Sequence, residues 1–300
     1  MGEREGGTVV NLLTFDIEDW YHANYDSVDL AIARNGESNF RANMELLLQI
    51  CSEAGCKATF FVLGQIGERY PETVREIVRA GHEVASHGYG HQLAYRQSYD
   101  EFKADVKKSA EILQALTGEA VWGYRAPSWS IVRRNYHYLA ALEELGLQYD
   151  ASIFPVKTFL YGIPDAPTEI HHPTVNGRQL NLLEVPMSVT RIGGRNIGYS
   201  GGFYFRLLPT WLIKKLIRAG NAAGRHSIVY LHPRELDPKE QKLRLPLVES
   251  FIQYYNVSGT QQKLSEILRS FRFVSIRERL STVAMLPDEE GGGQTNCQNK

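Results

Sequence analysis

Two histidines separated by three residues, His87 and His91, are the first positions in the sequence that suggest chemistry. Imidazoles at this spacing can reach one cation, because about one helical turn separates them. Glycines at positions 88 and 90 let the backbone between them bend tightly. The pair follows the segment 81–85, which is typical of a short strand entered from a helix, and α/β folds keep their chemistry at the carboxyl ends of strands. The pattern favours a metal site over two surface histidines in a flexible loop.

A run of carboxylates, Asp16, Glu18 and Asp19, follows an apolar segment at 9–15 that is typical of a buried strand. In an extended chain Asp16 and Glu18 lie on the same side, so one can act as a base while the other binds metal. Two imidazoles and one carboxylate leave positions open for water and substrate. This ligand set suits Zn²⁺ first, with Co²⁺, Ni²⁺, Fe²⁺ or Mn²⁺ as alternatives, and such an ion activates water for hydrolysis. The alternative interpretation is a solvated acidic turn.

Strands and helices alternate along the chain and must position these groups. Apolar runs predict strands near 9–15, 58–63, 81–85, 120–124, 147–149, 181–185, 227–231 and 271–276. Helical periodicity predicts helices near 39–54, 71–80, 98–117, 131–145, after 209 and at 260–269. Five strands end in polar groups, namely Asp16 with Glu18 and Asp19, His87 with His91, Arg125, Asp150, and His232. An α/β barrel of parallel strands brings such ends together on one face, which is the strongest sign of an enzyme in the sequence.

The composition limits the class of protein. The 300 residues are 43% hydrophobic and carry a formal net charge of −1. The chain can therefore bury a large core and suggests neither a nucleic-acid partner nor an anionic-membrane surface, although a local patch stays open. No stretch reaches the roughly 18 apolar residues of a membrane span, and no signal-peptide core is visible, so we expect no transmembrane segment and a soluble cytoplasmic protein. The 3 cysteines are too few for a disulfide framework. The oligomeric state is not predicted.

Taken in order, the motifs resemble the polysaccharide deacetylase family, the NodB-homology domain of carbohydrate esterase family 4. The resemblance rests on Thr14-Phe15-Asp16, His87-Gly88-Tyr89-Gly90-His91, Arg125-Ala126-Pro127, Asp150 and Leu231-His232. It implies a distorted, incomplete (β/α) barrel over residues 9–280, and we expect disordered tails at 1–8 and 287–300. The segments 201–209 and 231–238 are similar to a C-terminal extension of deacetylases from bacterial exopolysaccharide gene clusters linked to exosortase systems.

The resemblance also implies catalytic roles for four residues. Asp16 would be the general base, and Arg125 would pair with it and hold it ionised. His232 would be the general acid, with Asp150 orienting it and raising its basicity. These roles agree with the acid and base chemistry that the residue types allow.

The metal ligands implied by the resemblance are His87 and His91. The common family motif has two adjacent aspartates, whereas Ile17 separates Asp16 from Glu18 in this chain. We therefore expect Glu18 as the third ligand of one divalent ion, with Asp19 as the alternative carboxylate.

Five further residues are candidate contacts to substrate: Leu231, Trp129, Tyr89, Ser128 and Glu184. The resemblance implies that Leu231 lines the pocket for the acetyl methyl group. Ser128 and Trp129 stand where a tyrosine is usual, and a backbone N–H there can complete an oxyanion hole. Glu184 either contacts substrate or simply ends a strand. Gly88 replaces the usual Ser or Thr, which removes a hydroxyl that would steady the loop.

The resulting hypothesis is a metal-dependent hydrolase that removes the acetyl group of an N-acetylated sugar in a glycan or glycan precursor, releasing acetate and a free amine. The alternatives are another metal-dependent hydrolase, acting on a phosphoester or a non-sugar amide, and a carbohydrate-binding protein without catalysis. We further expect the segments 154–178 and 192–202 to be loops that wall the substrate cleft, since long loops in a compact domain are often functional.

Overall fold

A curled parallel sheet forms the centre of this computed structural model, which describes residues 9–22, 38–158, 161–240 and 242–282. Its strands follow the order β11-β1-β2-β3-β4-β5-β8, and β12 also pairs with β1. These strands are β1 (Asn11–Ile17), β2 (Thr59–Val62), β3 (Glu83–Ser86), β4 (Gly123–Tyr124), β5 (Tyr149–Asp150), β8 (Leu183–Glu184), β11 (Ile228–Leu231) and β12 (Phe273–Val274). All of their pairings are parallel. The predicted incomplete barrel is confirmed, while the predicted tails lie outside the described residues.

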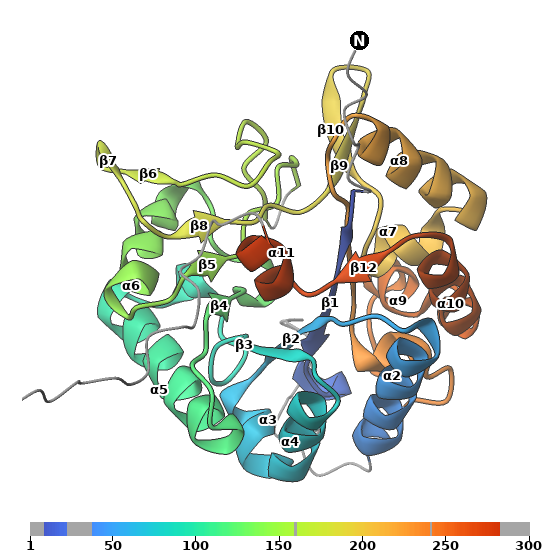
Figure 1. Cartoon of the computed structure of the whole chain (residues 1–300), viewed down its shortest axis with the longest axis horizontal. Coiled ribbons are helices and arrows are strands. Elements are labelled where there is room, and N and C mark those ends of the chain that lie inside the picture. The colour runs from blue at the N-terminus through green and yellow to red at the C-terminus, as the bar shows by residue number, and fades with distance from the viewer. Residues whose placement is uncertain (1–8, 23–37, 159–160, 241, 283–300) are drawn as a thin grey trace, which may run out of the picture.

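Helices cover the outside of the sheet, as Figure 1 shows for α2 to α6, and α11 lies across the middle of the same view. The helices are α2 (Phe40–Ala54), α3 (Gly64–Arg69), α4 (Pro71–Arg79), α5 (Tyr99–Thr117), α6 (Leu139–Glu144), α7 (Gly202–Leu207), α8 (Thr210–Ala222), α9 (Leu247–Tyr254), α10 (Thr260–Ser270) and α11 (Ile276–Thr282). Ser98 and Glu101 form a capping box that begins α5, because each side chain accepts from the other residue's backbone N–H. None of the helices in the described ranges is long and apolar enough to cross a membrane.

Two predicted segments differ from the structure. The helix expected at 131–145 is a 3₁₀ helix, η4 (Arg133–Tyr138), followed by the short α6, because the backbone of Asn135 leaves helical geometry. The loop expected at 192–202 contains half of a hairpin formed by β9 (Val189–Ile192) and β10 (Arg195–Gly198). Gly193 and Gly194, both at positive φ, make its two-residue turn, so the glycines that suggested a loop in fact close a hairpin.

The expected loop at 154–178 also contains a strand. It contains β6 (Thr174–Val175), which pairs with β7 (Arg178–Gln179). His171 exchanges two backbone hydrogen bonds with Glu184 of the main sheet. The segment is therefore attached to the edge of the sheet at β8.

Side chains of the central strands alternate between two faces of the sheet, and this alternation decides what can reach the site. Phe15 and Leu231, neighbours in register across β1 and β11, pack with the helices on the outer face. Tyr230 and Phe61 belong to a separate cluster inside the half-barrel, together with Trp129. Residues next to each other in one strand thus belong to different clusters.

Candidate active site

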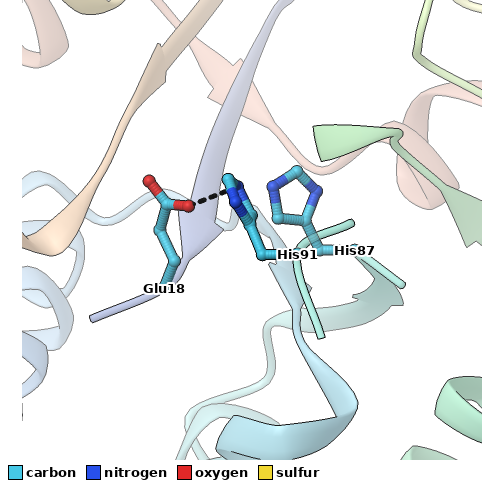
Figure 2. Close-up of side chains that lie close together, drawn as sticks. All are labelled: Glu18, His87 and His91. Carbon is cyan, nitrogen blue, oxygen red and sulfur yellow. Dashed lines mark ion pairs between the residues drawn. The ribbon is translucent and has the colours of Figure 1, made fainter. Parts of the chain in front are cut away.

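Glu18, His87 and His91 lie together at the carboxyl ends of β1 and β3. One ligand atom from each of these buried residues lies within 4.8 Å of the others. His91 Nε2 is 2.5 Å from Glu18 Oε2, and Figure 2 shows the His87 ring beside this pair. One carboxylate and two imidazoles converging in this way form a donor set that suits a divalent first-row metal ion. The structure brings these three predicted residues together, while their role as metal ligands stays a prediction.

The backbone fixes the orientations of His87 and His91, and these orientations suit metal ligands. His87 Nδ1 lies 2.8 Å from the carbonyl oxygen of Arg125, so this nitrogen donates and Nε2 is the acceptor. Burial lowers the pKa of His87 to about 4, so the ring is neutral near pH 7, as a ligand must be. His91 has a φ of 57°, a left-handed conformation that non-glycine residues adopt rarely and mostly at functional sites.

The loop between the histidines is steadied by Asp105 of α5. Its carboxylate accepts from the backbone N–H of Tyr89 at 2.8 Å. A Cβ added at Gly88 would lie 2.8 Å from Asp105 Oδ2, and the φ of Gly88 is 79°. A side chain at position 88 would be strained by the positive φ and would meet the Asp105 carboxylate, so glycine is favoured here.

Glu18 is the electrostatic centre of the group. Burial alone would raise the pKa of its carboxyl, but Arg234, His91 and His232 together hold it well below the usual value. Arg234 forms an ion pair with Glu18 Oε1, and His232 Nε2 lies 3.4 Å from the same oxygen. The sequence analysis missed Arg234. It lies directly after the strand 228–231 and His232, which was the available signal.

Asp19, the alternative carboxylate ligand, is engaged elsewhere. Its Oδ1 accepts from the backbone N–H of Trp20 at 2.9 Å and from the hydroxyl of Ser38 at 2.7 Å. Among the described residues, the group with metal-ligand spacing contains Glu18 and not Asp19. The structure therefore favours the first of the two predicted carboxylates.

The predicted pair of Asp16 and Arg125 is confirmed. Arg125 Nη1 lies 2.7 Å from Asp16 Oδ1, and both side chains are buried. The guanidinium also donates to the Thr14 hydroxyl at 2.9 Å and, through Nε, to the carbonyl of Ala151 at 3.2 Å. These bonds fix Arg125 on the inner face of the sheet and keep a positive charge beside Asp16.

The predicted pairing of Asp150 with His232 is wrong. His232 Nδ1 lies 2.8 Å from Glu235 Oε2, and the same oxygen accepts from the His232 backbone N–H. Arg206 donates to the other oxygen of Glu235 at 2.7 Å and helps to hold the pKa of that carboxyl below its usual value against the effect of burial. Glu235 therefore takes the orienting position that the resemblance gave to Asp150.

Asp150 faces away from the site because of its place in β5. Its neighbours Tyr149 and Ala151 belong to the inner cluster, so the side chain of Asp150 points to the outer face. There it is a register partner of Glu184 in β8, and both carboxyls are fully buried. This placement favours the second of the two alternatives for Glu184, that it ends a strand and does not contact substrate.

The predicted position of Leu231, in the pocket for the acetyl methyl group, is also wrong. It is fully buried with Phe15 among the residues of the outer face, so it does not line a pocket inside the half-barrel. The inward side chain is Tyr230, whose ring lies 4.5 Å from that of Trp129. Because side chains alternate along β11, the aromatic residue one position earlier points into the half-barrel in place of Leu231.

Trp129 and Ser128 lie in a strained turn, with φ of 49° and 51°. The Trp129 backbone N–H donates to the carbonyl of Ala126 at 3.1 Å, so it does not serve as a free oxyanion donor in this conformation. Tyr89 donates its hydroxyl to Glu68 at 2.9 Å, and Lys108 lies over its ring. Contacts of Ser128, Trp129 and Tyr89 to substrate stay predictions.

Two hollows in the described structure are candidates for the place where a substrate binds. One, of about 180 Å³, is lined by Trp20, Arg234 and Glu235 together with Gln253 and Tyr254 of α9, and it adjoins the Glu18 group through Arg234. Another, of about 1080 Å³, is lined by parts of the 154–178 segment and the β9–β10 hairpin. The residues that line the second hollow do not include the Glu18 group, so the role of these segments as cleft walls stays a prediction.

Comparison with known proteins agrees with this geometry. Residues 7–149 match the model of the polysaccharide deacetylase family, and residues 151–281 match a domain of unknown function, DUF3473. The N-terminal half of the chain is therefore similar to the polysaccharide deacetylase family, in agreement with the motifs of the sequence. The fold over the whole chain resembles the crystal structure of a candidate polysaccharide deacetylase from Mycobacterium smegmatis, with a TM-score of 0.58, 21% identity and coverage of 98% of this chain and 97% of the other.

Two curated relatives are similar to part of the chain. The peptidoglycan deacetylase of Helicobacter pylori is 28% identical over 151 residues, which are 47% of this chain and 50% of that protein. The peptidoglycan-N-acetylglucosamine deacetylase of Bacillus cereus is 29% identical over 111 residues, 37% of this chain and 40% of that protein. The aligned region thus spans half or less of these relatives.

Proposed function

We propose that this protein is a metal-dependent N-deacetylase that hydrolyses the acetamide of an N-acetylated sugar in a glycan or glycan precursor. The observation that carries the proposal is the convergence of three parts: the Glu18, His87 and His91 group, the Asp16–Arg125 pair, and His232 with Nε2 3.4 Å from Glu18. The names of the two relatives support this reaction and its substrate class.

Glu18, His87 and His91 would hold the ion, with zinc as the first candidate. The fit rests on the donors themselves: a neutral imidazole with its acceptor nitrogen free of the backbone, a second imidazole, and a carboxylate with a lowered pKa. A divalent ion bound there would polarise the amide carbonyl and make water more acidic.

The remaining residues divide the proton transfers. Asp16, beside Arg125, is placed to take the proton of the attacking water. His232, with Nδ1 directed to Glu235, presents Nε2 to the centre of the site and is placed to protonate the departing amine. Glu235 fixes the orientation of that ring, and Arg206 fixes Glu235.

The test compares an amide substrate with an aryl acetate. Asp16→Asn and His232→Ala should each lower acetate release from N-acetylglucosamine oligomers by about 10²–10⁴-fold, the usual contribution of one acid or base. A phenolate leaves without a proton, so the aryl acetate should partly rescue His232→Ala and not Asp16→Asn. Asp100→Asn, at an exposed carboxylate of α5, is the matched control. Unchanged acetate release in Asp16→Asn would remove the proposed base.

A further inference from the structure

Helix α9 presents an apolar face to solvent. None of its residues is buried, and Leu247, Val248, Phe251 and the following Tyr255 are 90%, 72%, 50% and 38% exposed. At 3.6 residues per turn these four positions lie on one side of the helix. Single exposed apolar residues are common on proteins, but a contiguous exposed group indicates an interaction surface.

The helix is held at its C-terminal end and at Phe251. The buried guanidinium of Arg206 donates to the carbonyls of Ile252 at 2.7 Å and Tyr255 at 2.6 Å, which end the helix. The ring of Phe203 in α7 lies 5.8 Å from that of Phe251. These contacts hold the apolar face in a fixed orientation.

Exposed cations lie directly before the apolar face. Lys239, Lys242 and Arg244 are exposed, and no ion pair joins any of them to an acid within the described parts of the chain. Leu243 packs against Trp20 and Tyr21, which fixes the segment that carries Lys242 and Arg244.

The acids near this surface are directed elsewhere or lie on another side. Glu240 accepts from Asn43 at 3.2 Å, and Asp237 accepts from Asn39 at 2.8 Å. Glu249, on α9 itself, is only partly exposed and lies outside the apolar arc. Asp237, Glu240 and Glu249 balance the three cations in formal charge, but these acids are only partly exposed, whereas Lys239, Lys242 and Arg244 are exposed before the apolar face.

We propose that the apolar face of α9 and the cations before it dock on the surface of an anionic lipid bilayer. An apolar helix face bordered by Lys and Arg is the pattern of interfacial membrane binding, because the apolar side chains enter the acyl boundary while the cations meet anionic headgroups. Gln253 and Tyr254 of the same helix line the hollow beside Arg234, so docking brings the headgroup region close to the candidate active site. The inference goes beyond the proposed function and does not depend on it.

The experiment is co-sedimentation of the full chain with vesicles that contain no glycan, made of phosphatidylcholine alone or mixed with phosphatidylglycerol. We expect preferential binding to the mixed vesicles that weakens with added salt. One basic residue near an anionic surface contributes roughly fivefold, so the double variant Lys242→Gln with Arg244→Gln should bind roughly 20-fold more weakly. Leu247→Ser with Phe251→Ser should weaken binding by about tenfold or more.

The matched control is Ile192→Ser, which removes an isoleucine that is 59% exposed on the β9–β10 hairpin. It should bind like the unaltered chain. Absent binding of the full chain to mixed vesicles, or equal binding of all variants, would overturn the proposal. Dimerisation that Phe251→Ser abolishes, in a chain that does not bind vesicles, would instead identify a second copy as the occupant.

Discussion

The buried carboxyl groups of Asp150 and Glu184 allow the pairing of β5 with β8 to be tested by substitution. The two residues are register partners on β5 and β8, and a hydrogen bond joins their side chains. Burial, together with the charge of Asp150, raises the pKa of Glu184 well above its usual value. The direction of this shift favours a proton shared by the pair, with Glu184 as the donor to Asp150.

Two substitutions separate this arrangement from simple packing. Glu184→Gln keeps a donor toward Asp150 and an acceptor for the backbone N–H of Ile153, which lies 3.1 Å from Glu184 Oε1. We expect its free energy of unfolding at neutral pH to stay within about 1 kcal/mol of the unaltered chain. Glu184→Leu leaves that N–H and the Asp150 carboxyl without this partner, at about 1–3 kcal/mol each, so it should lose about 2–6 kcal/mol.

The pH dependence has a defined sign. Since the folded state raises the pKa of Glu184 above the ordinary 4.5, its protonation stabilises the fold fully below that value. This stabilisation is lost as the pH rises through the folded-state pKa. The glutamine variant has no such proton, so its free energy of unfolding in urea should fall less as the pH rises above the ordinary pKa of about 4.5. Parallel curves for the two proteins, or equal losses in the glutamine and leucine variants, would refute a shared proton.

Two further predictions concern the site. Elemental analysis should find about one divalent ion per unaltered chain and much less metal in His87→Ala. The control His137→Ala, at an exposed histidine of η4, should keep its metal. Equal metal content in all three proteins would exclude the Glu18 group as the binding site. Arg125→Met leaves the buried Asp16 without its partner, which should lower the free energy of unfolding by about 3–5 kcal/mol in urea unfolding, and a loss below about 1 kcal/mol would contradict the pairing.

The parts that the sequence predicted depend on local signals. The strand before His87, the glycines after it and the capping box at Ser98 are short-range patterns, and the structure places all of them as expected. The convergence of Glu18, His87 and His91 follows from one topological rule, that parallel strands end at the same edge.

The errors arose where a choice between neighbouring positions was required. The order of motifs suggested Asp150 and Leu231, but strand alternation turns both side chains to the outer face and turns Tyr230 inward. The partner of His232 is Glu235, three residues later in the 3₁₀ helix η5 (Pro233–Leu236), whose tight turn brings the carboxylate back to the ring. Sequence order alone does not specify which side chain faces inward.

The candidate site is shared between the two regions that match family models. The candidate metal ligands and the Asp16–Arg125 pair lie within 7–149, whereas His232, Arg234 and Glu235 lie within 151–281. One sheet joins the regions, because β1 of the first pairs with β11 and β12 of the second. A chain of polar contacts connects the candidate site with α9. His232 contacts Glu235, Glu235 pairs with Arg206, and Arg206 donates to a carbonyl at the end of α9. The region without an assigned function thus orients the candidate acid and carries the exposed apolar helix on the same set of buried polar groups.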